Sequence, residues 1–145
     1  MTRQDFEKLR DLPNKKIASD ISFEKKKETA PNFIFEQVPL ENSLGMDVIL
    51  NGTYKPAIPA VTFNFVLRGV GPICRLCVNG TMHKNAGRSH KHELLQDDDP
   101  RLNLPTAIAR PDLEGKSVKE IWETLCQQAG IMHTGKFIAP AGGAA

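Results

Sequence analysis

Residues 72–95 read PICRLCVNGTMHKNAGRSHKHELL, and the rest of the chain is organised around this stretch. Its two ends have the composition of strands, and the polar segment between them is interrupted by glycines, so the pattern predicts two strands joined by a loop. The stretch contains three of the four histidines and two of the three cysteines. We therefore expect a localised function to lie here.

The charge around this stretch is strongly uneven. Residues 48–92 contain no Asp or Glu but six basic residues, so the segment has a charge of +6 in a chain whose net charge is +2. Such a basic segment attracts an anionic partner, for example a nucleic acid, a nucleotide or a nucleoprotein complex. The alternative is that the basic residues only solvate the outer face of a sheet. The six residues are Lys55, Arg68, Arg75, Lys84, Arg88 and Lys91.

Length and composition are those of a globular protein. The 145 residues, 40% hydrophobic and 25% charged, predict a single domain over residues 1–138 and a flexible tail over residues 139–145. The first residues lack the apolar segment of a secretion signal, and no apolar run approaches the roughly 18 residues that a membrane span requires. We therefore expect a cytoplasmic protein without a membrane partner. Three cysteines fit reduced thiols better than a disulfide framework.

The rest of the chain predicts mostly strands between two helices. A short helix is expected over residues 2–12, where apolar residues recur on one side. Aromatic and β-branched content predicts strands over residues 32–40 and 61–67. Residues 46–50 predict another strand, which the dipeptide Asn51-Gly52 ends in a tight hairpin turn. Shorter strands are expected within residues 15–21 and 131–138.

The last helix has the clearest signal. Ser117 and Glu120 predict a capping box, and Gly130 is the residue expected at its end. Its apolar stripe needs an apolar surface, and the sheet is the expected one. The predicted fold class is therefore α+β, a curved antiparallel sheet of five or six strands with a short N-terminal helix and an amphipathic C-terminal helix packed on it. The stripe consists of Val118, Ile121, Trp122, Leu125, Cys126 and Ala129.

Two groups of residues in the central stretch have the chemistry of metal ligands. Cys74 and Cys77 form a Cys-x-x-Cys motif, which together with nearby histidines is typical of zinc sites. On a strand, however, residues three apart point to opposite faces, so the two thiols would not reach one ion. His90 and His92 are two apart and point to the same face, where they can bind one metal or one phosphate.

A catalytic alternative adds residues from outside the strands. His83 would complete a three-histidine site for zinc or another divalent metal, and Asp97 would act as a nearby general base. This arrangement predicts a metal-dependent hydrolase or nuclease. Another alternative is that the acidic residues 97–99 mimic phosphates. The alternative for His90 and His92 is a purely structural role, in which they flank Lys91 on an edge strand and only solvate it.

The motifs in this stretch resemble those of a known family. Residues 75–80, 83–85 and 90–92, with Gly87, are similar to Arg-Leu-Asp-Ile-x-Gly, His-x-Asn-Pro-Asp-Gly and His-Leu-His in small bacterial and phage proteins that have no established activity. The resemblance implies a protein of phages or mobile elements that acts on host machinery, for example an inhibitor of a nucleic-acid-guided defence system. The departures are Cys77 in place of Asp, Ala86 in place of Pro-Asp, and Glu93 where an aromatic segment begins in the family.

The preferred hypothesis is a non-enzymatic binding protein without a cofactor. Its basic, histidine-bearing hairpin would gather positive groups and imidazole rings onto one exposed surface and engage an anionic ligand or a nucleoprotein complex. The resemblance adds the expectation of an anti-CRISPR-like inhibitor. The expected ligand-binding residues are Arg75, His83, Lys84, Asn85, Arg88, His90, Lys91 and His92.

Overall fold

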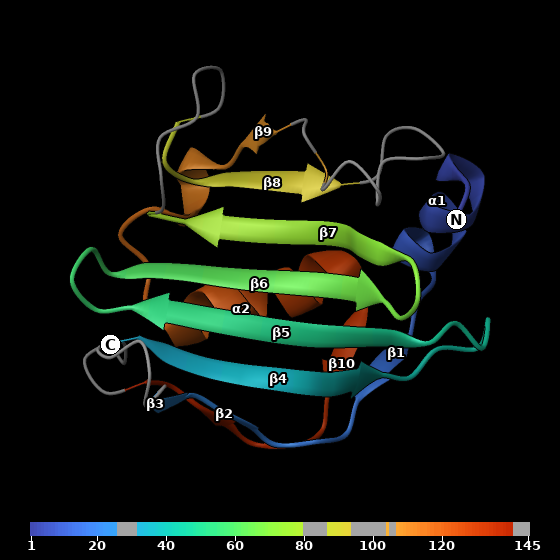
Figure 1. Ribbon diagram of the computed structural model, residues 1–145, viewed down its shortest axis with the longest axis horizontal. Helices are drawn as coiled ribbons and strands as arrows, with labels where there is room; N and C mark the ends of the chain where they lie inside the picture. Colours follow the sequence, from blue (N-terminus) through green and yellow to red (C-terminus); the bar gives the residue numbers. More distant parts are fainter. Residues whose placement is uncertain (26–31, 80–86, 94–103, 105–106, 141–145) are drawn as a thin grey trace.

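A seven-stranded antiparallel sheet forms the centre of the fold (Figure 1). The computed structural model describes residues 1–25, 32–79, 87–93, 104 and 107–140. Each strand of the sheet pairs with the next one along the chain, so the sheet is open and its edges are the two terminal strands. In sheet order the strands are β3 (Glu24–Lys25), β4 (Phe33–Leu40), β5 (Val48–Lys55), β6 (Ala60–Leu67), β7 (Gly71–Val78), β8 (His90–Glu93) and β9 (Ile108–Ala109).

The α+β class and the antiparallel pairing confirm the prediction, but the number of strands differs from the expected five or six. The sheet gains strands at its edges, where β3 and β9 consist of two residues each. A segment of two residues is too short to show an alternating pattern, so the sequence carries no signal for it. These two strands form because each pairs with a longer neighbour, β3 with β4 and β9 with β8.

The hairpin turn expected at Asn51-Gly52 is wrong, because β5 continues through both residues. Gly52 lies opposite Phe35 on β4, and a Cβ atom at this position would overlap with the Phe35 ring. The glycine therefore makes room for a core side chain instead of forming a turn. The chain turns between β5 and β6 at residues 56–59.

Both predicted helices are confirmed, including their ends. Helix α1 (Arg3–Asp11) begins after Thr2, whose hydroxyl accepts a 3.0 Å hydrogen bond from the backbone N–H of Asp5. Helix α2 (Val118–Ala129) begins with the predicted capping box between Ser117 and Glu120. It ends at Gly130, which has a φ of 65° that glycine adopts at little cost. A short 3-10 helix, η2 (Pro111–Leu113), precedes α2.

The main core lies between one face of the sheet and α2. Figure 1 shows α2 behind the central strands, and in the described part of the chain neither α-helix covers the opposite face. Trp122 of α2 packs on Phe63 of β6, with ring centroids 5.3 Å apart, and stacks on Phe137 at 5.6 Å. Each such buried side chain contributes about 1.5–3 kcal/mol of hydrophobic stabilisation. The helix is therefore fixed on the sheet by its apolar stripe, as expected.

Two short parallel pairs join the beginning of the chain to its end. Strand β1 (Lys15–Ile17) pairs with β10 (Ile131–His133), and β2 (Ile21–Ser22) pairs with β11 (Phe137–Ile138). Ile17 and Ile21 are completely buried by this arrangement. The pairing also places Lys15 beside the end of α2, where its backbone N–H donates a 3.0 Å hydrogen bond to the carbonyl of Gly130.

Within the described residues, no helix is both long enough and apolar enough to cross a membrane. Residues 141–145, which make up most of the expected tail, lie outside the described part of the chain.

Candidate functional site

The hairpin of β7 and β8 contains the histidine pair that the sequence singled out. His92 lies opposite Arg75 and His90 lies opposite Cys77, so these four residues share one face of the sheet. The two imidazole rings meet edge to face, with their centroids 4.8 Å apart. They point to the same side, as predicted, but they are buried, with exposed fractions of 2% for His90 and 1% for His92. The expected exposure of the imidazoles is therefore wrong, while their role in binding stays a prediction.

The two cysteines of the Cys-x-x-Cys motif lie on opposite faces of β7. Cys74 packs against the main core, whereas Cys77 accepts a 3.7 Å hydrogen bond from the hydroxyl of Thr62 on the other face. Among the described residues, no group of three or more His, Cys, Asp or Glu side chains could hold a metal ion. The three-histidine site stays a prediction because it needs His83, and the phosphate mimic stays one because it needs residues 97–99, all of which lie outside the described ranges. Lys84 and Asn85, two of the expected ligand-binding residues, also lie outside these ranges.

Lys91 points away from the histidine face. It lies opposite Leu76, a core residue, so its side chain is on the side of the sheet where the helices pack. Arg75 is on the histidine face, and Arg88 is exposed before β8. The expectation that these basic residues form one common surface is therefore wrong for Lys91, because successive residues of a strand point to opposite faces.

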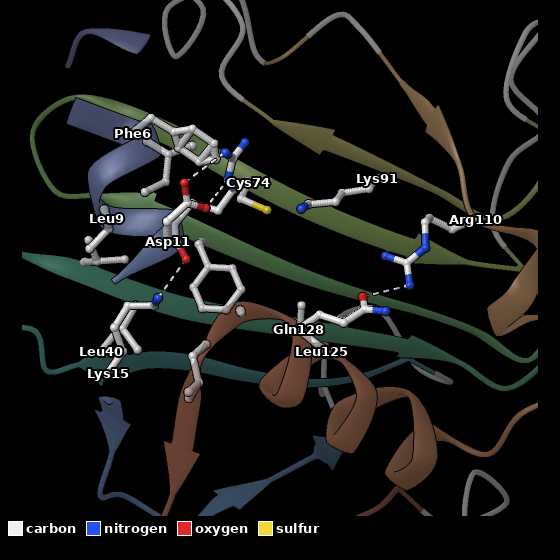
Figure 2. A pocket seen from close by; sticks show the side chains of 16 residues that line it. Phe6, Leu9, Asp11, Lys15, Leu40, Cys74, Lys91, Arg110, Leu125 and Gln128 are labelled. Atoms are coloured by element: carbon white, nitrogen blue, oxygen red, sulfur yellow. Dashed lines mark hydrogen bonds and ion pairs between the residues drawn. The ribbon is translucent and has the colours of Figure 1, made fainter. Parts of the chain in front are cut away.

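Lys91 instead lines a cavity of about 150 Å³ that is enclosed by the sheet, α1 and α2 (Figure 2). Figure 2 shows Phe6 and Leu9 of α1 on one side of this cavity, and Arg110 and Gln128 on the other. Five successive strands contribute to the floor, which is apolar apart from its last residue. The floor consists of Leu40, Val48, Phe65, Ile73, Cys74 and Lys91.

Four cationic side chains from separate parts of the chain line this cavity. They are Arg10 on α1, Lys15 on β1, Lys91 on β8 and Arg110 directly after β9. Asp11 is the one carboxylate among the described lining residues. The cavity therefore has an apolar floor and a strongly basic rim.

Two of these cations are fixed by the end of α1. The Lys15 ammonium donates hydrogen bonds to the carbonyls of Leu12 at 2.6 Å and Arg10 at 3.0 Å, which have no partner within the helix. Burial lowers the pKa of Lys15 from its ordinary value. The Arg10 guanidinium donates to both carboxylate oxygens of Asp11, at 2.9 and 3.2 Å, and this hydrogen bonding lowers the pKa of Asp11.

Glu93 stands beside the cavity and binds three cations at once. Its Oε1 atom accepts hydrogen bonds from Arg3 at 3.2 and 3.3 Å and from Arg10 at 3.3 Å, while its Oε2 atom lies 3.2 Å from the Lys91 ammonium. Burial raises the pKa of the Glu93 carboxyl, but Lys91 and Arg3 outweigh this effect, so the pKa is lower than its ordinary value. Glu93 thus joins three cations at the edge of the cavity, two of which have a further carboxylate partner, Asp11 for Arg10 and Glu7 for Arg3.

Arg110 is oriented by two neighbours on the opposite wall. Its Nε and Nη2 atoms each donate to the Asp112 carboxylate at 3.0 Å, and Nη2 also donates to the Gln128 amide oxygen at 2.9 Å. Within the described part of the chain, its Nη1 atom has no hydrogen-bond partner. Hydrogen bonding to Arg110 lowers the pKa of Asp112. The guanidinium is therefore held in position with donors left over.

The Cys74 thiol lies on the cavity floor and stays protonated. Burial raises its pKa to about 11, although the positive charges of Lys91, Arg10 and Arg110 act in the opposite direction. All three cations line the same cavity as this thiol. A neutral thiol is a weak nucleophile, so Cys74 contributes an apolar surface to the floor.

Of the four lining cations, Lys91 is among the predicted site residues, and the other three are not. Lys15 did have a signal, because a basic residue shortly after a helix often binds the last carbonyls of that helix. Arg10 lies in the last turn of α1, which favours basic residues whether or not a ligand site is present. Arg110 has no local signal, since it reaches the cavity only through the pairing of β9 with β8.

Comparison with known proteins gives no match to a protein-family model, a curated protein or a solved structure. The function is therefore inferred from the geometry of the cavity and of the hairpin.

Proposed function

We propose that the protein is a non-enzymatic binding protein whose ligand is a small anion, held in the cavity between the sheet, α1 and α2. The observation that carries this proposal is the convergence of four cationic side chains on one apolar cavity that has a single described lining carboxylate, Asp11. Positive charges around a partly enclosed, apolar volume attract an anion more strongly than the same charges in open water, because the local dielectric constant is lower.

The composition of the lining favours binding over catalysis. Among the described lining residues there is no His, Ser, Thr or Tyr, and both oxygens of the one carboxylate, Asp11, are bound by Arg10. The lining thiol, Cys74, is held protonated by burial. What remains is a basic rim that can position a negative charge and a floor that can receive an apolar group.

An NMR titration of the isotope-labelled full chain tests this proposal. The probes are benzoate, inorganic phosphate and adenosine monophosphate, each added at low and at high sodium chloride concentration. We expect at least one probe to shift the backbone amide signals of Ile73, Cys74, Gln128 and Ala129, and to bind more weakly at high salt because the rim charges are screened. If none of the three anions shifts these signals, the proposal is overturned.

We infer a wider role for the β7–β8 hairpin, in which it engages a nucleic acid or a nucleoprotein complex as a phage- or mobile-element-type inhibitor of host defence would. Arg75 on the sheet face that neither α-helix covers, and the exposed Arg88, support this role. Binding of short RNA and DNA should weaken steeply with salt, because contacts between basic residues and phosphates release counterions. Arg75→Met should weaken binding, whereas Arg68→Met, in the turn after β6, should not. Equal binding by both variants would contradict a role for the hairpin.

A further inference from the structure

We propose that the ligand of the cavity is a monocarboxylate with an apolar body about as large as one benzene ring, and that Lys91, Arg110 and Gln128 hold its carboxylate. This inference rests on the proposed function and deepens it, since it names the chemical class of the anion. The size of the cavity, the balance of charge around it and the donors left over on its rim each support the assignment.

The size of the cavity limits the apolar part of the ligand. An apolar cavity of roughly 150 Å³ holds one benzene molecule, and the cavity here has a volume of about 150 Å³. Phe65, Leu125 and Ile131 give it apolar walls. An inorganic phosphate would leave these walls without contacts, and most of a nucleotide would lie outside a cavity of this size. A single ring or a short branched chain fits both the volume and the lining.

The charge around the cavity limits the number of negative charges. The four lining cations are accompanied by three carboxylates, namely Asp11 on the lining, Glu93 beside Lys91 and Asp112 beside Arg110. Among the described side chains, four cations against three carboxylates leave a surplus of one, and Arg3, which also binds Glu93, is balanced by Glu7. One negative charge restores the balance, whereas the roughly 1.5–2 charges of a phosphate monoester near neutral pH exceed it.

The rim also shows which groups can receive the carboxylate. Lys15 is committed to two backbone carbonyls and Arg10 is bound to two carboxylates, so neither can turn to a ligand without losing these partners. The Lys91 ammonium has one described contact, at 3.2 Å to Glu93, and three protons to donate. The Arg110 guanidinium can donate from Nη1, and the Gln128 amide can donate from its nitrogen because its oxygen already accepts from Arg110.

In Figure 2, Lys91 lies between Cys74 and Arg110, and Gln128 lies beside Arg110, so all three polar side chains border the cavity. A carboxylate accepts several hydrogen bonds, and charged donors make the strongest ones. A ligand would therefore contact both the apolar lining and the polar groups if its ring packed on Phe65 and Leu125 and its carboxylate accepted hydrogen bonds from the three polar side chains. The Glu93 carboxylate holds the Lys91 ammonium beside the cavity, and the described cations of the lining still carry a net positive charge.

Isothermal titration calorimetry of the full chain with matched probes tests the ligand class. Benzoate provides the ring and the charge, benzamide provides the ring without the charge, and inorganic phosphate and adenosine monophosphate provide charge without a ring of the right size. We expect benzoate to bind at least about tenfold more tightly than the other three. Tighter binding of phosphate or of the nucleotide at the cavity would overturn the monocarboxylate and leave the proposed function standing. If none of the anions binds at the cavity, both the monocarboxylate assignment and the proposed function are overturned.

Substitutions test the residues that hold the carboxylate. Lys91→Met keeps an apolar stem and removes the charge, and Arg110→Gln is a second variant that leaves Glu93 and its partners intact. Each should weaken benzoate binding by about tenfold or more, whereas Lys119→Met, an exposed position on α2, should leave it within about twofold. Unchanged benzoate affinity in folded Arg110→Gln would overturn the assignment of the carboxylate site. The amide spectra of the variants show whether each is folded.

Discussion

The Lys91 ammonium lies 3.2 Å from Oε2 of Glu93, and both side chains point from β8 toward the cavity and away from the buried histidines. The same carboxylate binds Arg3 and Arg10 through its other oxygen. Glu93 is therefore the residue that keeps three mutually repelling cations together at the junction of α1 and the sheet. Its side chain is only 9% exposed, so solvent screens these interactions weakly.

Removal of the Glu93 charge should destabilise the protein. Glu93→Gln removes the carboxylate that Arg3, Arg10 and Lys91 share, and we expect the free energy of unfolding to fall by about 2 kcal/mol. Urea unfolding at neutral pH measures the change. The matched control is Glu7→Gln, which removes the exposed partner of Arg3 and should cost less than about 0.5 kcal/mol. Similar effects of both substitutions would contradict the central role of Glu93.

The stabilisation by Glu93 should depend on pH with a defined sign. The pKa of Glu93 in the folded protein is below its ordinary value of 4.5, so the unfolded chain binds the proton more tightly. The contribution of Glu93 is therefore complete above about pH 4.5 and is lost as the pH falls through the lower pKa of the folded state. Urea unfolding of the native protein and of Glu93→Gln between pH 7 and pH 3 should show two stabilities that converge in acid. A difference that widens as the pH falls would contradict this sign.

A side chain at position 52 should disturb the core of the sheet. Gly52→Ala places a methyl group against the ring of Phe35, and we expect the free energy of unfolding to fall by about 2–3 kcal/mol. Phe35→Leu makes room for the methyl group, so the double variant should lose less than the sum of the two single effects. Thermal unfolding of the native protein, the two single variants and the double variant measures this coupling. Additive effects would show that the two residues are not in contact.

The thiol on the cavity floor should react slowly in the native protein. With a pKa of about 11, roughly one Cys74 side chain in a thousand is a thiolate at pH 8. Iodoacetamide followed by peptide mass mapping should therefore label Cys74 in urea but leave it largely unmodified in buffer. Cys126, whose pKa is raised to about 12 by burial on α2, is the internal comparison and should behave in the same way. Fast labelling of Cys74 in buffer would contradict its raised pKa.

Local patterns in the sequence predicted the elements that depend on neighbouring residues. The capping box at Ser117 and the glycine at position 130 determine where α2 begins and ends, because their hydrogen bonds are made within a few residues. The direction of His90 and His92 was predictable for the same reason, since two residues of a strand that are two apart share a face. The pattern failed at Gly52, where the reason for the glycine is a ring on another strand.

The sequence by itself determined the α+β composition, the two helices with their caps, and the alternation that separates Lys91 from the histidines. Tertiary structure decided which residues share a site, because Arg10, Lys15, Lys91 and Arg110 come together only when β1 pairs with β10 and β9 pairs with β8. It also decided that the histidines are buried. Periodicity and capping act over a few residues, whereas a cavity is formed by side chains that are 100 or more positions apart in the chain, such as Arg10 and Arg110.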